Sequence, residues 1–158
     1  MADLEVQRAA MKKLSFLVGK WTGECRLLQR SGDLVSVAQS EEAQYKLGGL
    51  VLVIEGLGQS KTDGTMAMQA LGIITFDDAS GTYQMRAFND GRFVEAEVKL
   101  LLEGNGITWG FSSEKYKTAS VLRVSEEGVW TERSEITIGS QPPVTFLEMA
   151  VHREILVP

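Results

Sequence analysis

One stretch in the middle of the chain decides the fold class: Phe93-Val94-Glu95-Ala96-Glu97-Val98-Lys99-Leu100. From Val94 to Leu100 every second residue is apolar, and the residues between are charged. Because successive side chains of a β-strand point to opposite faces, this pattern predicts a strand with one buried face and one solvated face. Glu95 and Glu97 are therefore expected to be exposed.

Turn signals recur about every ten residues on both sides of this strand. They are rich in Gly, Asn and Asp, which tolerate the positive φ angles of tight hairpins: Ser31-Gly32-Asp33, Gly48-Gly49, Thr62-Asp63-Gly64, Asp77 to Gly81, Asn89-Asp90-Gly91, Glu103 to Gly106, Glu126-Glu127-Gly128 and Gly139 to Pro143. The segments between these turns have the length of strands.

The first segment of the chain follows a different period. Leu4, Met11 and Leu14 recur at helical spacing, and Asp3 precedes them as a capping residue. A short apolar plug then ends at Gly19. We therefore expect a short N-terminal helix that covers one end of the fold.

These features together predict a single all-β domain over residues 1–158, with the helix and plug in 1–19 and the barrel strands in 20–157. Strands do not alternate with helices, which excludes a parallel α/β sheet. The alternatives are a sandwich and a closed antiparallel up-and-down barrel. The even spacing and short hairpins favour a barrel of about ten strands.

Composition excludes several partners. The net charge is -5, and the basic residues are scattered, which argues against a nucleic acid or an anionic membrane surface as partner. The N-terminus has no apolar core of a signal peptide, and no apolar run approaches the roughly 20 residues of a membrane-spanning helix. A single cysteine, Cys25, excludes an internal disulfide and favours a reducing compartment. We expect a cytoplasmic protein.

Four short motifs, in order, carry a family resemblance: Leu17-Val18-Gly19-Lys20-Trp21-Thr22-Gly23, Gly48-Gly49, Ala70-Leu71-Gly72 with Phe76-Asp77, and Phe146 to Met149 with Arg153. The chain resembles uncharacterised bacterial lipocalin-like proteins of the calycin superfamily, kin to fatty-acid-binding proteins and nitrobindins. The resemblance implies a calycin barrel whose closed end is crossed by Trp21, with Arg153 over the indole. An indole face and a guanidinium stack favourably, so we interpret this pair as structural closure.

Candidate chemistry is sparse. His152 is the only histidine, and resemblance to nitrobindins makes it a candidate haem ligand. If Arg153 covers Trp21, however, alternation directs His152 outward. Cys25 shares the parity of Trp21 and is interpreted as a small buried residue, and metal-binding cysteine clusters are absent from the sequence. Gly56-Leu57-Gly58 lacks the rest of a dinucleotide fingerprint.

Among the acidic residues, Glu132 stands out because it shares the parity of Trp130. A buried carboxylate of this kind, partnered by Arg86 or Arg133, would orient a polar ligand group. No residues are assigned as catalytic, and the question of an enzyme stays open, with a binding protein favoured.

The most informative pattern is a set of aromatic and methionine side chains whose parity directs them into the barrel. Such a lining is typical of a small-molecule cavity: Tyr45, Met68, Met85, Trp109, Phe111, Trp130 and Met149. We therefore predict that the protein binds a small apolar or amphipathic molecule inside the barrel without a cofactor. One alternative is a haem protein that uses His152, and the other is a filled barrel that acts as an interaction protein and forms a homodimer.

Overall fold

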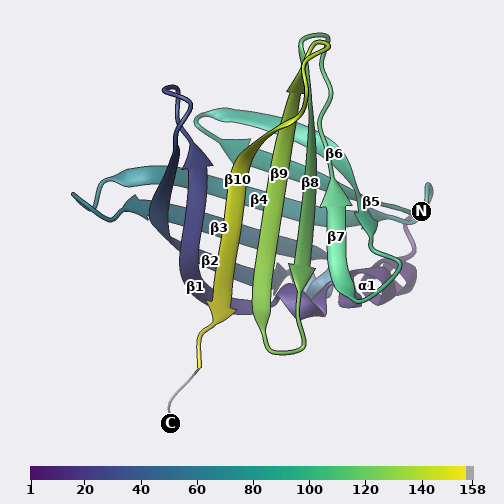
Figure 1. Ribbon diagram of the computed structural model, residues 1–158. Coiled ribbons are helices and arrows are strands. Elements are labelled where there is room, and N and C mark those ends of the chain that lie inside the picture. The colour runs from purple at the N-terminus through teal and green to yellow at the C-terminus, as the bar shows by residue number, and fades with distance from the viewer. Residues whose placement is uncertain (156–158) are drawn as a thin grey trace.

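Ten antiparallel strands follow one another around a closed barrel in the computed structural model, which describes residues 1–155 (Figure 1). The strands are β1 (Gly19–Leu28), β2 (Leu34–Lys46), β3 (Val51–Ser60), β4 (Met66–Asp77), β5 (Thr82–Asn89), β6 (Arg92–Leu100), β7 (Asn105–Trp109), β8 (Tyr116–Val124), β9 (Val129–Ile138) and β10 (Val144–Arg153). Each strand pairs with its neighbours in sequence, and β1 also pairs with β10. The predicted up-and-down barrel is confirmed, although its last strand ends at Arg153. Of the rest of the expected barrel segment, residues 154 and 155 belong to no strand, and positions 156 and 157 lie outside the described residues.

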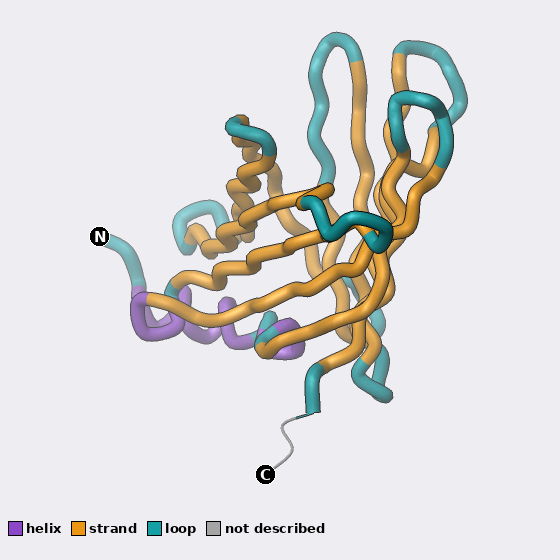
Figure 2. Tube along the Cα trace, turned by 90° about the vertical axis from the view of Figure 1, so that its left-hand side faces the viewer, coloured by secondary structure: helices purple, strands orange, loops and turns teal. Residues whose placement is uncertain are grey.

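The N-terminal segment contains the predicted short helix, α1 (Leu4–Lys12), followed by a 3-10 turn, η1 (Ser15–Leu17). A second 3-10 turn, η2 (Leu47–Gly49), joins β2 to β3. The Asp3 side chain accepts hydrogen bonds from two backbone N–H groups of the first helical turn, as an N-cap does. Figure 2 shows α1 lying along one end of the barrel.

Two tyrosines of the barrel hold the end of α1. The hydroxyl of Tyr83 donates a hydrogen bond to the carbonyl of Ala10 at 2.7 Å, and that of Tyr45 donates to the carbonyl of Met11 at 2.6 Å. The carbonyls of Ala10 and Met11 also accept backbone hydrogen bonds from Lys13 and Leu14, so each tyrosine hydroxyl adds a second bond at the end of the helix. The helix is thereby fixed to β2 and β5.

The closed end is built around Trp21, which is fully buried. Its indole N–H donates to the carbonyl of Leu17 at 2.9 Å, and the guanidinium carbon of Arg153 lies 4.2 Å from its ring centroid. Arg153 also donates to the carbonyls of Phe16 and Val18. One side chain of β10 therefore joins the plug, β1 and β10.

The two glycines that flank this tryptophan are required by close approach. A Cβ on Gly19, whose φ is +136°, would lie 2.8 Å from a guanidinium nitrogen of Arg153. A Cβ on Gly23 would lie 2.2 Å from the carbonyl oxygen of Ala150 on β10. The two glycines of the Gly-x-Trp-x-Gly pattern are therefore needed because the first and last strands pack closely together.

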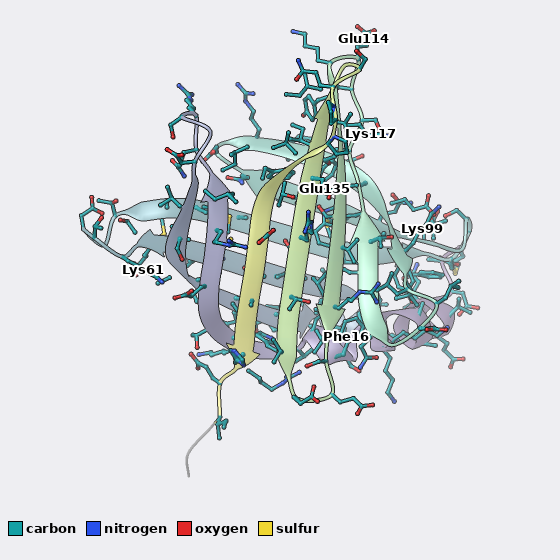
Figure 3. All side chains as sticks on the ribbon, in the orientation of Figure 1. Phe16, Lys61, Lys99, Glu114, Lys117 and Glu135 are labelled. Atoms are coloured by element: carbon teal, nitrogen blue, oxygen red, sulfur yellow. The ribbon has the colours of Figure 1, made fainter. Side chains whose placement is uncertain are left out.

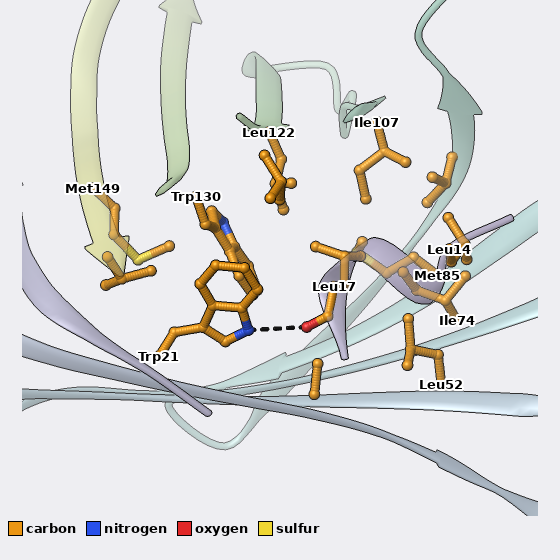
Figure 4. Packing of buried hydrophobic residues seen from close by; sticks show 14 of the residues in the cluster. Leu14, Leu17, Trp21, Leu52, Ile74, Met85, Ile107, Leu122, Trp130 and Met149 are labelled. Carbon is orange, nitrogen blue, oxygen red and sulfur yellow. Dashed lines mark hydrogen bonds between the residues drawn. The ribbon is translucent and has the colours of Figure 1, made fainter. Parts of the chain in front are cut away.

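Apolar side chains from α1, η1 and the inner faces of the strands form one core (Figure 4). Trp21 and Trp130 meet edge to face, with ring centroids 5.4 Å apart. Charged side chains project from the outside of the barrel, as the labelled Lys61, Lys99 and Glu135 illustrate (Figure 3). Glu95 is exposed, as expected, and forms an ion pair with Arg86 at 2.9 Å.

The barrel is least tightly joined between β6 and β7. Only two residue pairs connect these strands, Lys99 with Thr108 and Leu100 with Ile107. Val94 lies on the inward parity of β6, opposite Ala87, yet its side chain is exposed. The inward-parity face of β6 is therefore exposed to solvent near the start of the strand.

Candidate ligand-binding cavity

A cavity of about 170 Å³ remains inside the barrel, beyond the layer that contains Trp21. Most of its wall is apolar, and three methionines contribute to it: Met68 on β4, Met85 on β5 and Met149 on β10. The polar wall consists chiefly of two carboxyl groups, those of Glu41 and Glu132, together with Asn89. The interior is therefore neither completely filled nor completely apolar.

The structure brings together most of the side chains that the sequence assigned to the lining. Met68, Met85, Trp109, Trp130 and Met149 all face the cavity. Their convergence follows from strand alternation, which directs every second side chain inward on each strand.

Two expected lining residues lie elsewhere. Tyr45 has inward parity, but its hydroxyl group donates a hydrogen bond to the carbonyl of Met11 in α1 at the closed end, so it does not face the cavity. Phe111 lies beyond the end of β7 at Trp109, where its backbone hydrogen-bonds with Thr118 instead of continuing the strand. Strand parity therefore ceases to apply at Phe111.

Glu41 is the functional candidate that sequence reasoning missed. It lies on β2, 8 % exposed, and its Oε1 accepts a hydrogen bond of 2.8 Å from Nε2 of Gln39, which is 2 % exposed. The room for both side chains comes from β3: a Cβ on Gly56 would lie 2.6 Å from Glu41 Oε1, and one on Gly58 would lie 2.7 Å from Gln39 Oε1.

A sequence signal for this pair was present. Val37, Gln39, Glu41 and Ala43 share one parity, and the apolar ends of that series mark its inward face. Gly56-Leu57-Gly58, which we considered only as a nucleotide motif, is the complementary part of the signal. Alternate glycines on a strand leave space for large side chains on the neighbouring strand.

Glu132 on β9 faces the cavity from another wall, and its backbone pairs with Met149 and Leu122. Glu132 is half-buried and borders the cavity. Burial raises its pKa to about 7, and the nearby Trp130 N–H acts in the opposite direction. That indole N–H is buried, and among residues 1–155 no acceptor meets it in hydrogen-bond geometry.

The two carboxyl groups influence each other. Burial and, to a lesser extent, the charge of Glu132 raise the pKa of Glu41 to about 8, against the opposing effect of the hydrogen bond from Gln39. The pKa of the Cys25 thiol rises to about 12 through burial and through the charges of Glu132 and Glu41. The cavity therefore disfavours negative charge, as a poorly solvated site must.

The arginines considered as partners for Glu132 lie outside the barrel. Arg86 pairs with Glu95, and Arg133 lies 3.4 Å from Glu135 and 3.7 Å from Glu148. Alternation explains this arrangement, because Arg133 follows Glu132 directly and points the other way. The residues that line the cavity in the described part of the chain include no Lys, Arg or His.

His152 does not fit a haem ligand. Its side chain is exposed, and its backbone pairs with Thr22 on the outer face of β1 and β10, away from the cavity lining. The cavity of about 170 Å³ is also below the roughly 300–1,000 Å³ of sites for drug-sized ligands, and haem is larger still. Over residues 1–155, no cluster of three or more His, Cys, Asp and Glu side chains is arranged to hold a metal ion.

A depression of about 440 Å³ on the outer surface shares Met68, Ala70, Leu71 and Asn89 with the cavity. These residues belong to β4 and to the end of β5, so the depression and the cavity adjoin there.

The fold and the cavity define a closed ten-strand antiparallel barrel with an internal polar pair. Among the solved structures that share this fold, two are similar over nearly the whole chain. The crystal structure of Rv2717c from M. tuberculosis superposes with a TM-score of 0.73 at 13% identity, covering 92% of this chain and 98% of that one. The S-type phycobiliprotein lyase CPES from Guillardia theta superposes with a TM-score of 0.62 at 8% identity, covering 96% of each chain. No family model and no curated protein sequence matched the chain.

In the described residues, no helix has both the length and the apolar character needed to cross a bilayer.

Proposed function

We propose that this protein binds a small amphipathic molecule in the barrel cavity. The observation that carries the proposal is the composition of the cavity wall, in which methionine and tryptophan side chains surround two buried carboxyl groups. Flexible methionines adapt to an apolar body, and a few polar groups orient it. The volume of about 170 Å³ limits the ligand to a small molecule.

The burial of two carboxyl groups in a cavity whose described lining carries no basic side chain supports a binding role over a purely structural one. A buried carboxyl group without a basic partner lowers stability, and replacement by an apolar residue of similar volume is often tolerated or favourable. Glu41 and Glu132 occupy such positions side by side with large apolar side chains. Polar groups held at this cost in a cavity are typical of functional sites.

A family assignment is part of the same proposal. The order of the Gly-x-Trp-x-Gly, Gly-Gly and late Arg153 motifs supports kinship with uncharacterised bacterial lipocalin-like proteins, and the shared barrel fold of the solved structures is compatible with it. A cytoplasmic location, which the single cysteine favours, is proposed on the same footing.

Tryptophan fluorescence tests the binding role, because Trp109 and Trp130 both border the cavity. We expect a saturable change in emission on titration with small cyclic alcohols and amines. Ala70→Leu on β4 fills part of the cavity and should abolish the response, whereas Ala119→Leu, on the exposed face of β8, should leave it unchanged. The proposal is contradicted if the emission change persists in Ala70→Leu. It is also contradicted if no small ligand changes the emission of the wild type.

A further inference from the structure

We propose that the ligand is a small organic cation, an amine whose protonated nitrogen is held by the carboxyl groups of Glu41 and Glu132 and whose apolar body lies against the methionines. This inference rests on the proposed function and specifies the chemical class that the cavity selects.

The first argument is the arrangement of charge. Glu41 belongs to β2 and Glu132 to β9, strands that are separated around the barrel by β1 and β10, so the two carboxyls reach the cavity from different walls. The described residues that line the cavity carry no positive side chain. A bound ammonium would supply the missing countercharge, and hydrogen bonds between ionised groups are about twice as strong as neutral ones.

The second argument comes from the indole of Trp130. Trp130 is 1 % exposed and lines the cavity, yet among residues 1–155 its indole N–H makes no hydrogen bond of good geometry, although it lies near enough to the Glu132 carboxyl group to lower the pKa of that group. An unpaired buried donor is costly, whereas the N–H of the other buried tryptophan, Trp21, is satisfied by a backbone carbonyl. A ligand oxygen would satisfy Trp130, so an amine that also carries a hydroxyl group fits the site best.

The aromatic walls support the same class of ligand. Trp109 and Trp130 both border the cavity, and indole is the side chain that attracts cations most strongly through its ring face. An anionic ligand is disfavoured, because it would approach two carboxyl groups with no basic residue in the lining to offset the repulsion.

Binding of a cation should be linked to proton release. Burial holds the pKa of Glu41 at about 8 and that of Glu132 at about 7, so the free protein retains protons in the pair near neutral pH. An ammonium favours the ionised carboxylates and displaces those protons. The affinity for an amine should therefore increase from pH 6 to pH 8.5, and the affinity for a neutral alcohol should not.

Isothermal titration calorimetry of the full chain tests this with cyclohexylamine, cyclohexanol, trans-2-aminocyclohexanol and cyclohexanecarboxylate. At pH 8 we expect cyclohexylamine to bind at least about tenfold more tightly than cyclohexanol, and the amino alcohol more tightly still. Titrations in two buffers of different ionisation enthalpy should show that the amines release protons. The carboxylate should bind least.

Glu132→Gln and Glu41→Gln keep the side-chain volume and should each remove most of the preference for amine over alcohol, together with the proton release. Glu135→Gln is the matched control, because Glu135 lies on the same strand but points outward toward Arg133. Circular dichroism and thermal melting verify that each variant is folded. Equal affinities for amine and alcohol, or a preference that survives Glu132→Gln, overturn the cation inference while binding in the cavity stands. Absence of binding by all four probes overturns both proposals.

Discussion

Glu41 of β2 occupies the space that a side chain at residue 56 would need. A Cβ on Gly56 of the neighbouring strand β3 would lie 2.6 Å from Oε1 and 2.9 Å from Oε2 of Glu41. The two residues are paired directly across the ladder. The missing side chain at Gly56 therefore leaves room for the carboxyl group, and the Gln39 amide donates a hydrogen bond that orients it.

Gly56→Ala should displace the Glu41 carboxyl group, because the clash falls on the flexible end of a side chain rather than on backbone. We expect the hydrogen bond with Gln39 to break and stability to fall by about 1 kcal/mol. NMR titration should show the pKa of Glu41 moving away from about 8. Gly72→Ala is the control, since its Cβ would meet only the Ile54 carbonyl oxygen, at 3.9 Å.

The stability of the protein should depend on pH through the same carboxyl groups. Burial raises the pKa of Glu41 from its ordinary 4.5 to about 8, so between these values the folded state binds more protons than the unfolded state. The stabilisation of the folded state by the protonated Glu41 carboxyl group is therefore fully present below about pH 4.5 and is lost as the pH rises through 8.

Glu41→Gln should remove much of this loss, so that the variant exceeds the wild type at pH 9 by on the order of 3 kcal/mol. Urea unfolding at pH 6 and pH 9 measures the difference. Glu42→Gln, at the next and outward-facing position, should retain the pH dependence of the wild type. An identical pH dependence of stability in the wild type and in Glu41→Gln would refute a buried carboxyl group with a raised pKa at this position.

Arg153 should contribute to stability through geometry as well as charge. Arg153→Lys retains the charge but loses the planar group that stacks on Trp21 and donates to the carbonyls of Phe16 and Val18. We expect a loss of about 2 kcal/mol, measured as a lower urea midpoint with an unchanged m-value. His152→Ala, at the adjacent exposed position, should change the midpoint little, and comparable effects of both substitutions would contradict the closure role.

Cys25 should be chemically inert in the folded protein. It is fully buried, and its pKa lies at about 12, so the reactive thiolate is scarce at pH 8. Alkylation by iodoacetamide, followed by mass spectrometry, should be negligible in native buffer and rapid in 8 M urea. Fast modification of the folded chain would show that the cavity admits solvent to β1.

Local features of the chain were sufficient to predict the barrel. The informative patterns each extend over a few residues: the alternation in Phe93–Leu100, the repeated turns and the change of period after Gly19. Short hairpins then bring neighbouring strands together as antiparallel pairs. The same alternation placed Met68, Met85 and Trp130 on inward faces, where the structure has them. It misplaced Phe111, because a strand's parity ends where its hydrogen bonds end.

The sequence by itself determined the type of sheet, the order of the strands and the inward or outward direction of most side chains, since these depend on patterns within one strand or one hairpin. Only the tertiary structure decided that Glu41 meets the space at Gly56 and shares a cavity with Glu132, and that the guanidinium of Arg153 reaches the plug. These relationships depend on register and closure. Register shifts between β3 and β4 and between β9 and β10, together with the pairing of the first strand with the last, set which inward residues face one another across the interior.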